Sequence, residues 1–262
     1  MPLQAIEAQR LYQQVAQQIR EMILSGEYRV GDRLPAERDL ARGLRVSRPT
    51  IREAMIALEI AGLVEIRTGA GIFVSDQPAR NAEPASRAFD VGSSPFELLA
   101  ARRFVECELA AQAAAGATDA DLEAIEESVR AMASDIEAGR PAQQADRDFH
   151  SRIAAVSRNS VLVSIVHSLW DGTFEPLFAG LSARTGLPRN ERMTLADHRA
   201  VLAALKRRDA EGARRAMATH LGHVEKILAG AADLARGNTG GRPARAGTAK
   251  PKNINQTTGG SR

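Results

Sequence analysis

The sequence predicts a mainly α protein in which an N-terminal winged helix-turn-helix, with its β-hairpin, precedes an all-α antiparallel helical bundle. Two short helical patterns separated by a tight turn, and then two β-prone runs, predict the first part. From residue 95 onward, apolar residues recur at helical spacing without a strand pattern, which predicts the second part. The length of 262 residues allows two such domains.

The first two helices are predicted by apolar spacing and by helix-start signals. Apolar residues recur every four positions over 11–23, which predicts a helix there. Pro35 fits the first turn of the next helix, where its missing N–H costs nothing. Glu37 and Asp39 in the same turn complement the helix dipole. We expect this second helix to stop near Gly43, because glycine commonly ends helices.

The third helix is the one expected to read DNA. Ser47 is a good N-cap, and Arg48 and Arg52 share a face near the helix start because they are four residues apart. A helix-turn-helix places this end of its second helix in the major groove, where arginine reads guanine. The alternative is a small α+β module with solvated arginines, but 41–52 holds four arginines and no acid. The opposite, buried stripe consists of Ile51, Ala54, Met55 and Leu58.

The β-hairpin expected after this helix would form the wing. The runs 63–67 and 71–74 are short and β-prone, and Thr68-Gly69-Ala70 joins them. Gly69 and Gly71 would let the backbone approach a phosphate or the minor groove closely, because glycine has no Cβ. We therefore place the DNA-binding domain at residues 1–75.

The motifs of this domain resemble those of a known family. They are Leu34-Pro-Ala-Glu-Arg38, Val46-Ser-Arg48, Ile51-Arg-Glu-Ala54, Leu58, Gly62-Leu63 and Gly69-x-Gly71-x-Phe-Val74. In this order and spacing they resemble the winged helix of GntR-type bacterial transcription regulators. The resemblance implies contact with double-stranded DNA by Arg38, Arg48, Thr50 and Arg52, with Gly69 at the wing tip. Pro49 stands where other members often have threonine or arginine.

The remainder of the chain divides into a linker, a helical domain and a tail. Residues 76–94 contain prolines and serines with little periodic pattern, which indicates a linker. Residues 95–235 form the helical domain, an antiparallel bundle of six or seven helices. Residues 236–262 carry six basic residues and no acid, and we expect a disordered basic tail. The helices expected in the bundle span about 95–117, 118–138, 142–157, 160–170, 191–207 and 209–235.

Four side chains of the bundle form a candidate metal site. Asp146 and His150 are four residues apart on one helix, while His198 and His220 lie in line with apolar residues on two other helices. A single inward histidine is usually a hydrogen-bonded core residue, but a carboxylate with three imidazoles suits a divalent metal. Zinc is the first choice, with nickel or manganese as alternatives.

A second resemblance covers this bundle. It is carried by Asp146-Arg-Asp-Phe-His150, Ile153, Asn159, Asp197-His198, Leu202, Leu205 and Ala216-Met217-x-x-His220-Leu221. These residues resemble the FadR-branch ligand-binding domain called FCD. The resemblance implies a metal held by the Asp/His/His/His set, with a small carboxylate effector on or beside it. Arg102 matches an arginine of such members, which implies that its guanidinium binds the effector carboxylate.

A narrower resemblance spans about residues 10–230. Its more distinctive parts are Val74-Ser-Asp-Gln-Pro78 and Pro95-Phe-Glu-Leu-Leu99, and further parts are Arg10-Leu-Tyr-Gln-Gln14 and Asn159-Ser-Val-Leu-Val163. These segments are similar to the repressors of hexuronate-utilisation genes. The resemblance implies that the effector is a sugar acid, such as a hexuronate.

Charge, cysteine content and hydropathy limit the other possibilities. The formal charge is +3, but it becomes −3 without the basic tail, so the charge alone is weak support for DNA binding. Cys107 is the only cysteine, which excludes an intrachain disulfide and fits the cytoplasm. We find no signal peptide and no apolar run long enough for a membrane span.

The leading hypothesis is a dimeric, effector-controlled repressor that is not an enzyme and reads a pseudo-palindromic operator. Regulators that respond to the metal itself or to a long-chain acyl-CoA are alternatives within the same family. A metal-dependent hydrolase is the alternative outside it, because an Asp/His metal site can activate water. Glu106 and Asp148 are the only candidates for its general base, and neither lies in a distinctive motif.

Overall fold

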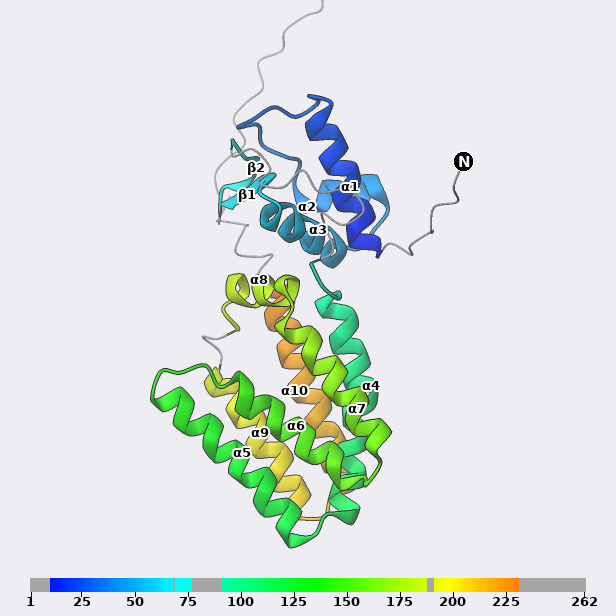
Figure 1. Ribbon diagram of the computed structural model, residues 1–262, viewed down its shortest axis with the longest axis vertical. Coiled ribbons are helices and arrows are strands. Elements are labelled where there is room, and N and C mark those ends of the chain that lie inside the picture. Colours follow the sequence, from blue (N-terminus) through cyan, green and yellow to red (C-terminus); the bar gives the residue numbers. More distant parts are fainter. Residues whose placement is uncertain (1–9, 68, 77–90, 188–190, 231–262) are drawn as a thin grey trace, which may run out of the picture.

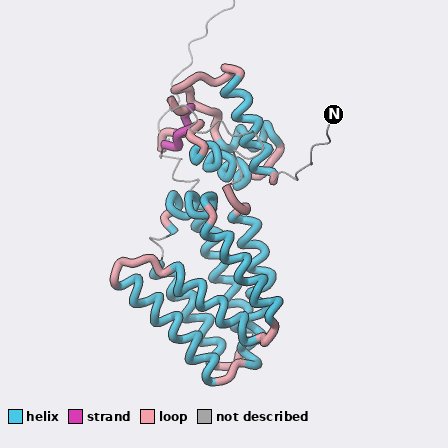
Figure 2. The backbone as a smooth tube through the Cα atoms, viewed as in Figure 1, coloured by secondary structure: helices cyan, strands magenta, loops and turns pink. Residues whose placement is uncertain are grey.

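The computed structural model describes residues 10–67, 69–76, 91–187 and 191–230. Figure 1 shows a smaller N-terminal part packed on one end of an elongated helical part. Apart from one hairpin, the described chain consists of helices joined by short loops, as Figure 2 shows. The mainly α fold class predicted from the sequence is confirmed. The predicted tail and most of the predicted linker lie outside the described residues.

The N-terminal part is a winged helix-turn-helix. The Ser47 side chain caps α3 by accepting a hydrogen bond from the Thr50 backbone N–H at 3.2 Å. The hairpin is antiparallel and pairs Val64 with Val74, which confirms the expected strands. One detail differs from prediction, because Gly43 lies inside α2 and Arg45 ends that helix in the left-handed region, with a φ of 56°. The elements are α1 (Leu11–Leu24), α2 (Glu37–Leu44), α3 (Arg48–Ile60), β1 (Val64–Arg67) and β2 (Gly71–Val74).

The helical part contains seven α-helices within the described residues. Six of them match the expected spans, while α8 was not among the spans expected from the sequence. Pro176 begins α8, and Gly186 ends it with a φ of +70°. The elements are α4 (Pro95–Gly116), α5 (Asp119–Glu137), α6 (Gln143–Val156), α7 (Ser160–Asp171), a 3₁₀ turn (Gly172–Phe174), α8 (Pro176–Thr185), α9 (Glu191–Lys206) and α10 (Ala210–Gly230).

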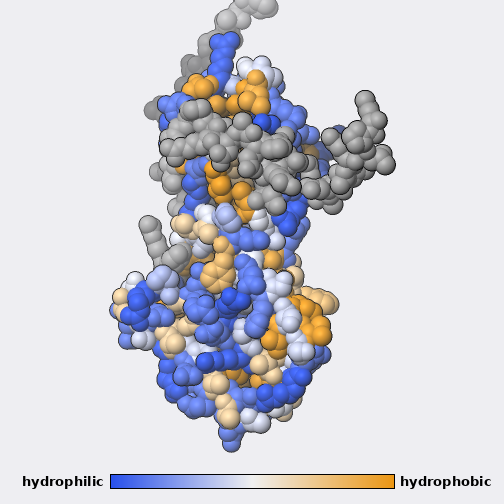
Figure 3. All heavy atoms as spheres, viewed as in Figure 1, coloured by the Kyte–Doolittle hydropathy of each residue, from blue (hydrophilic) through white to orange (hydrophobic). Residues whose placement is uncertain are grey.

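Helix α10 lies at the centre of the bundle, where it packs against α4 and α9 (Figure 1). Buried apolar side chains of α10 and of the helices around it form the core, and they include Leu109, Phe149, Leu205 and Met217. The face of the helical part seen in Figure 3 is mostly hydrophilic, although apolar side chains gather over α7 at its right. None of the described helices has the length and apolar character that crossing a membrane requires.

The two parts meet along α3, whose residues Ile51 to Leu58 are all buried. One side of α3 packs against α1, α2 and β1, as the predicted apolar stripe requires. The other side packs on α8, where a Cβ added to Gly180 would lie 3.2 Å from Cγ2 of Ile56. Glu59 and Arg184 form an ion pair across the same contact. The expected DNA-reading helix α3 therefore forms the contact of the N-terminal part with the helical part.

Glu53 is buried in this contact and accepts a hydrogen bond of 2.5 Å from the hydroxyl of Ser94, the N-cap of α4. Burial raises the pKa of Glu53 to about 7, although the Ser94 hydrogen bond opposes the shift. A carboxyl group whose pKa is raised in the folded state costs stability as pH rises from the unfolded value toward the folded one.

We expect Glu53→Gln to stabilise the protein at pH 8 by about 1–3 kcal/mol more than at pH 4.5. The amide cannot ionise, yet it still accepts the Ser94 hydrogen bond. Urea unfolding of both proteins at the two pH values measures the difference. An equal effect at both pH values would show that ionisation of Glu53 costs the fold nothing.

Candidate metal and effector site

Three helices bring the four predicted metal ligands together. Helix α6 supplies Asp146 and His150, α9 supplies His198, and α10 supplies His220. One potential ligand atom of each residue lies within 4.8 Å of those of the other three. The three histidines are at most 2% exposed, so the cluster is enclosed by the bundle.

The separations between these atoms fit a metal ion. Nε2 of His198 lies 3.0 Å from Oδ1 of Asp146 and 3.4 Å from Nε2 of His150, and the latter atom lies 3.3 Å from Oδ1. Ligands about 2.0–2.2 Å from zinc at tetrahedral angles stand roughly 3.3 Å apart. Phe149 packs edge-on against His150 and His198, with ring centroids 5.3 and 4.8 Å away, and so holds both imidazoles in place. The donor set therefore fits zinc.

The protonation tendencies of two of the four ligands favour metal binding, while at His150 Glu106 and Asp146 outweigh burial and raise the pKa. Burial and the neighbouring His198 and His150 keep the pKa of His220 well below its usual value, so its imidazole is neutral. Burial opposes ionisation of Asp146, but His198 and His150 hold its pKa well below the ordinary range. Metal ligands must be deprotonated, and both groups meet that requirement at neutral pH.

Arg102 lies next to this cluster on α4 and is 4% exposed. Its Nε donates a 2.8 Å hydrogen bond to Oε1 of Glu106, and its guanidinium carbon lies 4.1 Å from the centre of the Trp170 indole ring. Nη2 of Arg102 and Nε1 of Trp170 are both buried without a hydrogen-bonding partner among the described residues. Two buried donors therefore lack a partner that any described residue supplies, which is uncommon for buried polar groups.

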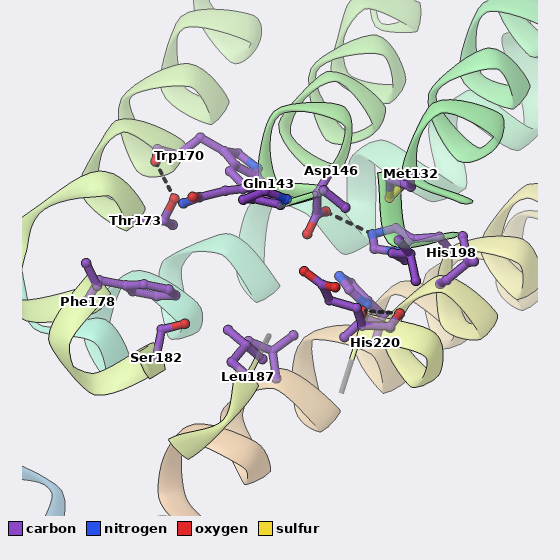
Figure 4. A pocket seen from close by; sticks show the side chains of 18 of the residues that line it. Met132, Gln143, Asp146, Trp170, Thr173, Phe178, Ser182, Leu187, His198 and His220 are labelled. Carbon is purple, nitrogen blue, oxygen red and sulfur yellow. Dashed lines mark hydrogen bonds and ion pairs between the residues drawn. The ribbon is translucent and has the colours of Figure 1, made fainter. Parts of the chain in front are cut away.

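A cavity of about 550 Å³ connects Arg102 and Trp170 with the metal cluster. Figure 4 shows Trp170, Phe178 and Ser182 across this cavity from the cluster residues His198 and His220. The volume lies within the range of small-molecule sites, and such sites combine apolar walls with a few polar groups. Other polar or charged residues that line it include Arg140, Gln143, Thr173, Glu191 and Thr194.

Two residues of this site, Glu106 and Trp170, were not predicted to have these roles. From the sequence, Glu106 was a candidate only for the general base of a hydrolase. In the structure Arg102 and His150 outweigh the effect of burial and lower the pKa of Glu106 to about 2, so it is a paired carboxylate and a weak base. The spacing of Arg102 and Glu106, four residues apart, could have indicated their ion pair.

The predicted DNA-binding residues lie in different surroundings. Arg38 is exposed on α2, and Gly69 is exposed at the wing with a φ of +76°. Arg48 and Thr50 are half-buried at the start of α3, and the Thr50 hydroxyl lies 2.7 Å from that of Ser47.

The sequence predicted that Arg48 and Arg52 share a face near the start of α3, but in the structure Arg52 is buried and Arg48 only half-buried. Arg52 is 5% exposed, and its Nη1 donates a 2.9 Å hydrogen bond to the Ala229 carbonyl in the last turn of α10. Nη2 of Arg52 contacts Glu37 at 3.3 Å. The reason is that the contact between the two parts covers this side of α3. DNA can reach Arg52 only if that contact opens.

A winged helix-turn-helix joined to a helical domain with an internal cavity is the architecture of a DNA-binding transcription regulator. Family models match both parts, one described as "Bacterial regulatory proteins, gntR family" over residues 11–74 and one as "FCD domain" over residues 97–223. The chain belongs to the GntR family of bacterial transcription regulators, and its helical domain is an FCD domain.

Curated relatives support this membership. The chain is 36% identical to the "Uxu operon transcriptional regulator" of Escherichia coli over 228 residues, which cover 86% of this chain and 89% of that protein. It is 36% identical to the "Exu regulon transcriptional regulator" of the same organism over 231 residues, which cover 86% of this chain and 87% of that protein. It is 30% identical to the "HTH-type transcriptional regulator LutR" of Bacillus subtilis, and the matched region covers 80% of this chain and 97% of that protein. These relatives are regulators, and the chain is not an enzyme.

Proposed function

We propose that this regulator is a cytoplasmic homodimeric repressor whose effector is a small sugar acid, with hexuronates as the first candidates. Residues 1–75 would bind one half of a pseudo-palindromic operator, with Arg38, Arg48, Thr50, Arg52 and Gly69 at the DNA. Two-fold related reading helices suit such an operator, which is why a second copy of the chain is needed. The names of the Uxu and Exu relatives agree with the hexuronate resemblance of the sequence.

One observation carries the effector proposal, the unpartnered Nη2 of Arg102 beside the Asp/His cluster. A buried carboxylate needs charge pairing and hydrogen bonds, or its desolvation cost prevails. A zinc ion held by Asp146, His150, His198 and His220 would supply positive charge at one side of the carboxylate, and Arg102 would supply hydrogen bonds at the other. The indole N–H of Trp170 would donate to an oxygen of the same ligand.

The remaining lining favours a polyhydroxylated acid over an acyl chain. Gln143, Ser182 and Thr194 offer amide and hydroxyl groups that can bind sugar hydroxyls. A fatty acyl chain would gain little from these groups and would leave buried donors unpaired. A regulator that responds to metal alone would have no use for the free Arg102 donor.

Trp170 is the only tryptophan of the chain, so its fluorescence reports on the cavity directly. We expect galacturonate, glucuronate or one of their keto isomers to change this fluorescence in the zinc-loaded protein and to release operator DNA. Arg102→Ala should weaken that binding roughly 10- to 100-fold, because it removes charge-assisted hydrogen bonds. Arg102→Lys should weaken it as well, since it keeps a charge beside Glu106 but lacks the planar fork.

Arg103→Ala is the matched control. Arg103 is 55% exposed and lies 3.8 Å from Glu225, so its loss should leave effector binding unchanged. Lactate, citrate and a long-chain acyl-CoA test the other ligand classes. A response to acyl-CoA alone, or to metal alone with Arg102 variants behaving as wild type, would contradict the sugar-acid proposal.

A further inference from the structure

Glu106 is a buried carboxylate that contacts two functional residues of the site at once. It lies on α4, is 2% exposed, and uses a different oxygen for each neighbour. Oε1 accepts the 2.8 Å hydrogen bond from Nε of Arg102, and Oε2 contacts Nδ1 of His150. Neither Oε2 nor Nδ1 has a hydrogen-bonding partner among the described residues, and the close ion-pair contact between them is the one that joins the two side chains.

The contact with His150 determines which ring nitrogen faces the metal cluster. Nε2 of His150 points to Asp146 and His198, at 3.3 and 3.4 Å, while Nδ1 points away from them to Glu106. An ionised carboxylate can only accept, so it keeps the proton of a neutral His150 imidazole on Nδ1 and leaves the Nε2 lone pair for the metal. Carboxylates that hold a ligating histidine in this way also raise its basicity as a metal ligand.

The contact with Arg102 determines the orientation of the guanidinium. With Nε fixed on Glu106 and the guanidinium carbon over the Trp170 ring, the guanidinium is held at the wall of the cavity, and its Nη2 has no partner among the described residues. The same carboxylate thus orients a metal ligand and the group expected to bind the effector.

We propose that Glu106 is the positioning residue of this site, which orients His150 for the metal and Arg102 for the effector carboxylate. The inference rests on the proposed metal and effector function, but its first test needs zinc alone. Glutamate is required because both neighbours donate and each needs an acceptor oxygen. Glutamine offers one oxygen and one NH₂ group, so one of the two neighbours would meet a donor instead.

Zinc affinity, measured by competition with a chromophoric chelator, tests the proposal. We expect Glu106→Gln to bind zinc roughly 10- to 100-fold more weakly than the wild type, which is the usual effect of losing such a partner. Glu108→Gln is the matched control, because Glu108 lies on the same helix but is 58% exposed and pairs with Arg214 at 2.8 Å. It should bind zinc as the wild type does.

Two further measurements separate positioning from a general structural role. Arg102→Gln keeps Glu106 on His150, so it should retain zinc affinity while losing sugar-acid binding. In long-range ¹H–¹⁵N correlation spectra of the zinc-loaded wild type, the Nδ1 proton of His150 should be shifted downfield and slow to exchange, as a proton bonded to a buried carboxylate is, which tests the proposal even if Glu106→Gln does not fold.

The outcomes distinguish this inference from the proposed function. If the wild type binds no zinc, the metal site and this inference both fail. If the wild type binds zinc and Glu106→Gln binds it equally well, or if the Nδ1 proton of His150 exchanges rapidly with solvent, only the positioning role of Glu106 is overturned.

Discussion

Replacing His198 with alanine is expected to abolish stoichiometric zinc binding and the stability that depends on it. His198 holds the centre of the cluster, where its Nε2 lies within hydrogen-bonding distance of both Asp146 and His150. A metal present at 1,000 times its dissociation constant stabilises a folded protein by about 4 kcal/mol. In a protein of this size that corresponds to a rise in Tm on the order of 10 °C.

Elemental analysis and thermal unfolding with and without a chelator measure both effects. The wild type should carry one zinc per chain and lose Tm on chelation, while His198→Ala should carry well under one equivalent and not respond to the chelator. His223→Ala is the control, because His223 lies one turn beyond His220 but is half-buried and bonds to Asp197 at 2.8 Å. A wild type without metal, or a His198→Ala variant with a full equivalent, would contradict the site.

The sequence was sufficient to predict the Asp/His cluster because the inward orientation of each residue follows from its own helix. Asp146 and His150 share a helix face through their spacing, and His198 and His220 each replace one member of an apolar stripe that must be buried. Three amphipathic helices of one small bundle bury those stripes in a common core. Predicting the cluster did not require knowing which helices pack against one another.

The partners of the cluster depend on such knowledge and were therefore not predicted. Glu106 contacts His150 only because α4 packs on α6, and Trp170 reaches Arg102 only because α7 lies beside α4. Helix α8 was missed for a different reason. It is ten residues long, and its apolar pattern is too short to be distinguished from a loop by periodicity.

The contact between the two parts also could not be predicted from the sequence, and it joins helices that line the cavity to α3. Helix α8 lines the cavity with Phe178 and Ser182, and the same helix packs against Ile56 of α3 through Gly180. Helix α10 carries His220 in the cluster and, near its end, the Ala229 carbonyl that binds Arg52. A ligand that shifts α8 or α10 therefore acts directly on the expected DNA-reading helix.

The strongest test of the proposed DNA-reading role of α3 is the pair of substitutions Arg48→Ala and Arg52→Ala. Each should weaken operator binding by about 1–3 kcal/mol, or roughly 5- to 150-fold, because a base-reading arginine contributes that much discrimination. Gel-shift titrations at one fixed salt concentration measure the effect, since affinity for DNA depends steeply on salt. Arg130→Ala in α5 is the control, because Arg130 is 59% exposed, pairs with Glu123 and lies far along the chain from the winged helix.

Arg52→Ala separates two roles that the structure brings together in one side chain. If Arg52 leaves Ala229 and reads DNA, its loss weakens binding as the loss of Arg48 does. If its role is only to tie α3 to α10, through the 2.9 Å bond to the Ala229 carbonyl, its loss frees α3 and operator affinity is unchanged or higher. We expect the first result, because the resemblance of the winged helix places this arginine at the DNA. Unchanged or tighter binding by Arg52→Ala, beside a weakened Arg48→Ala, would remove Arg52 from the DNA-binding set and leave it as an interdomain contact.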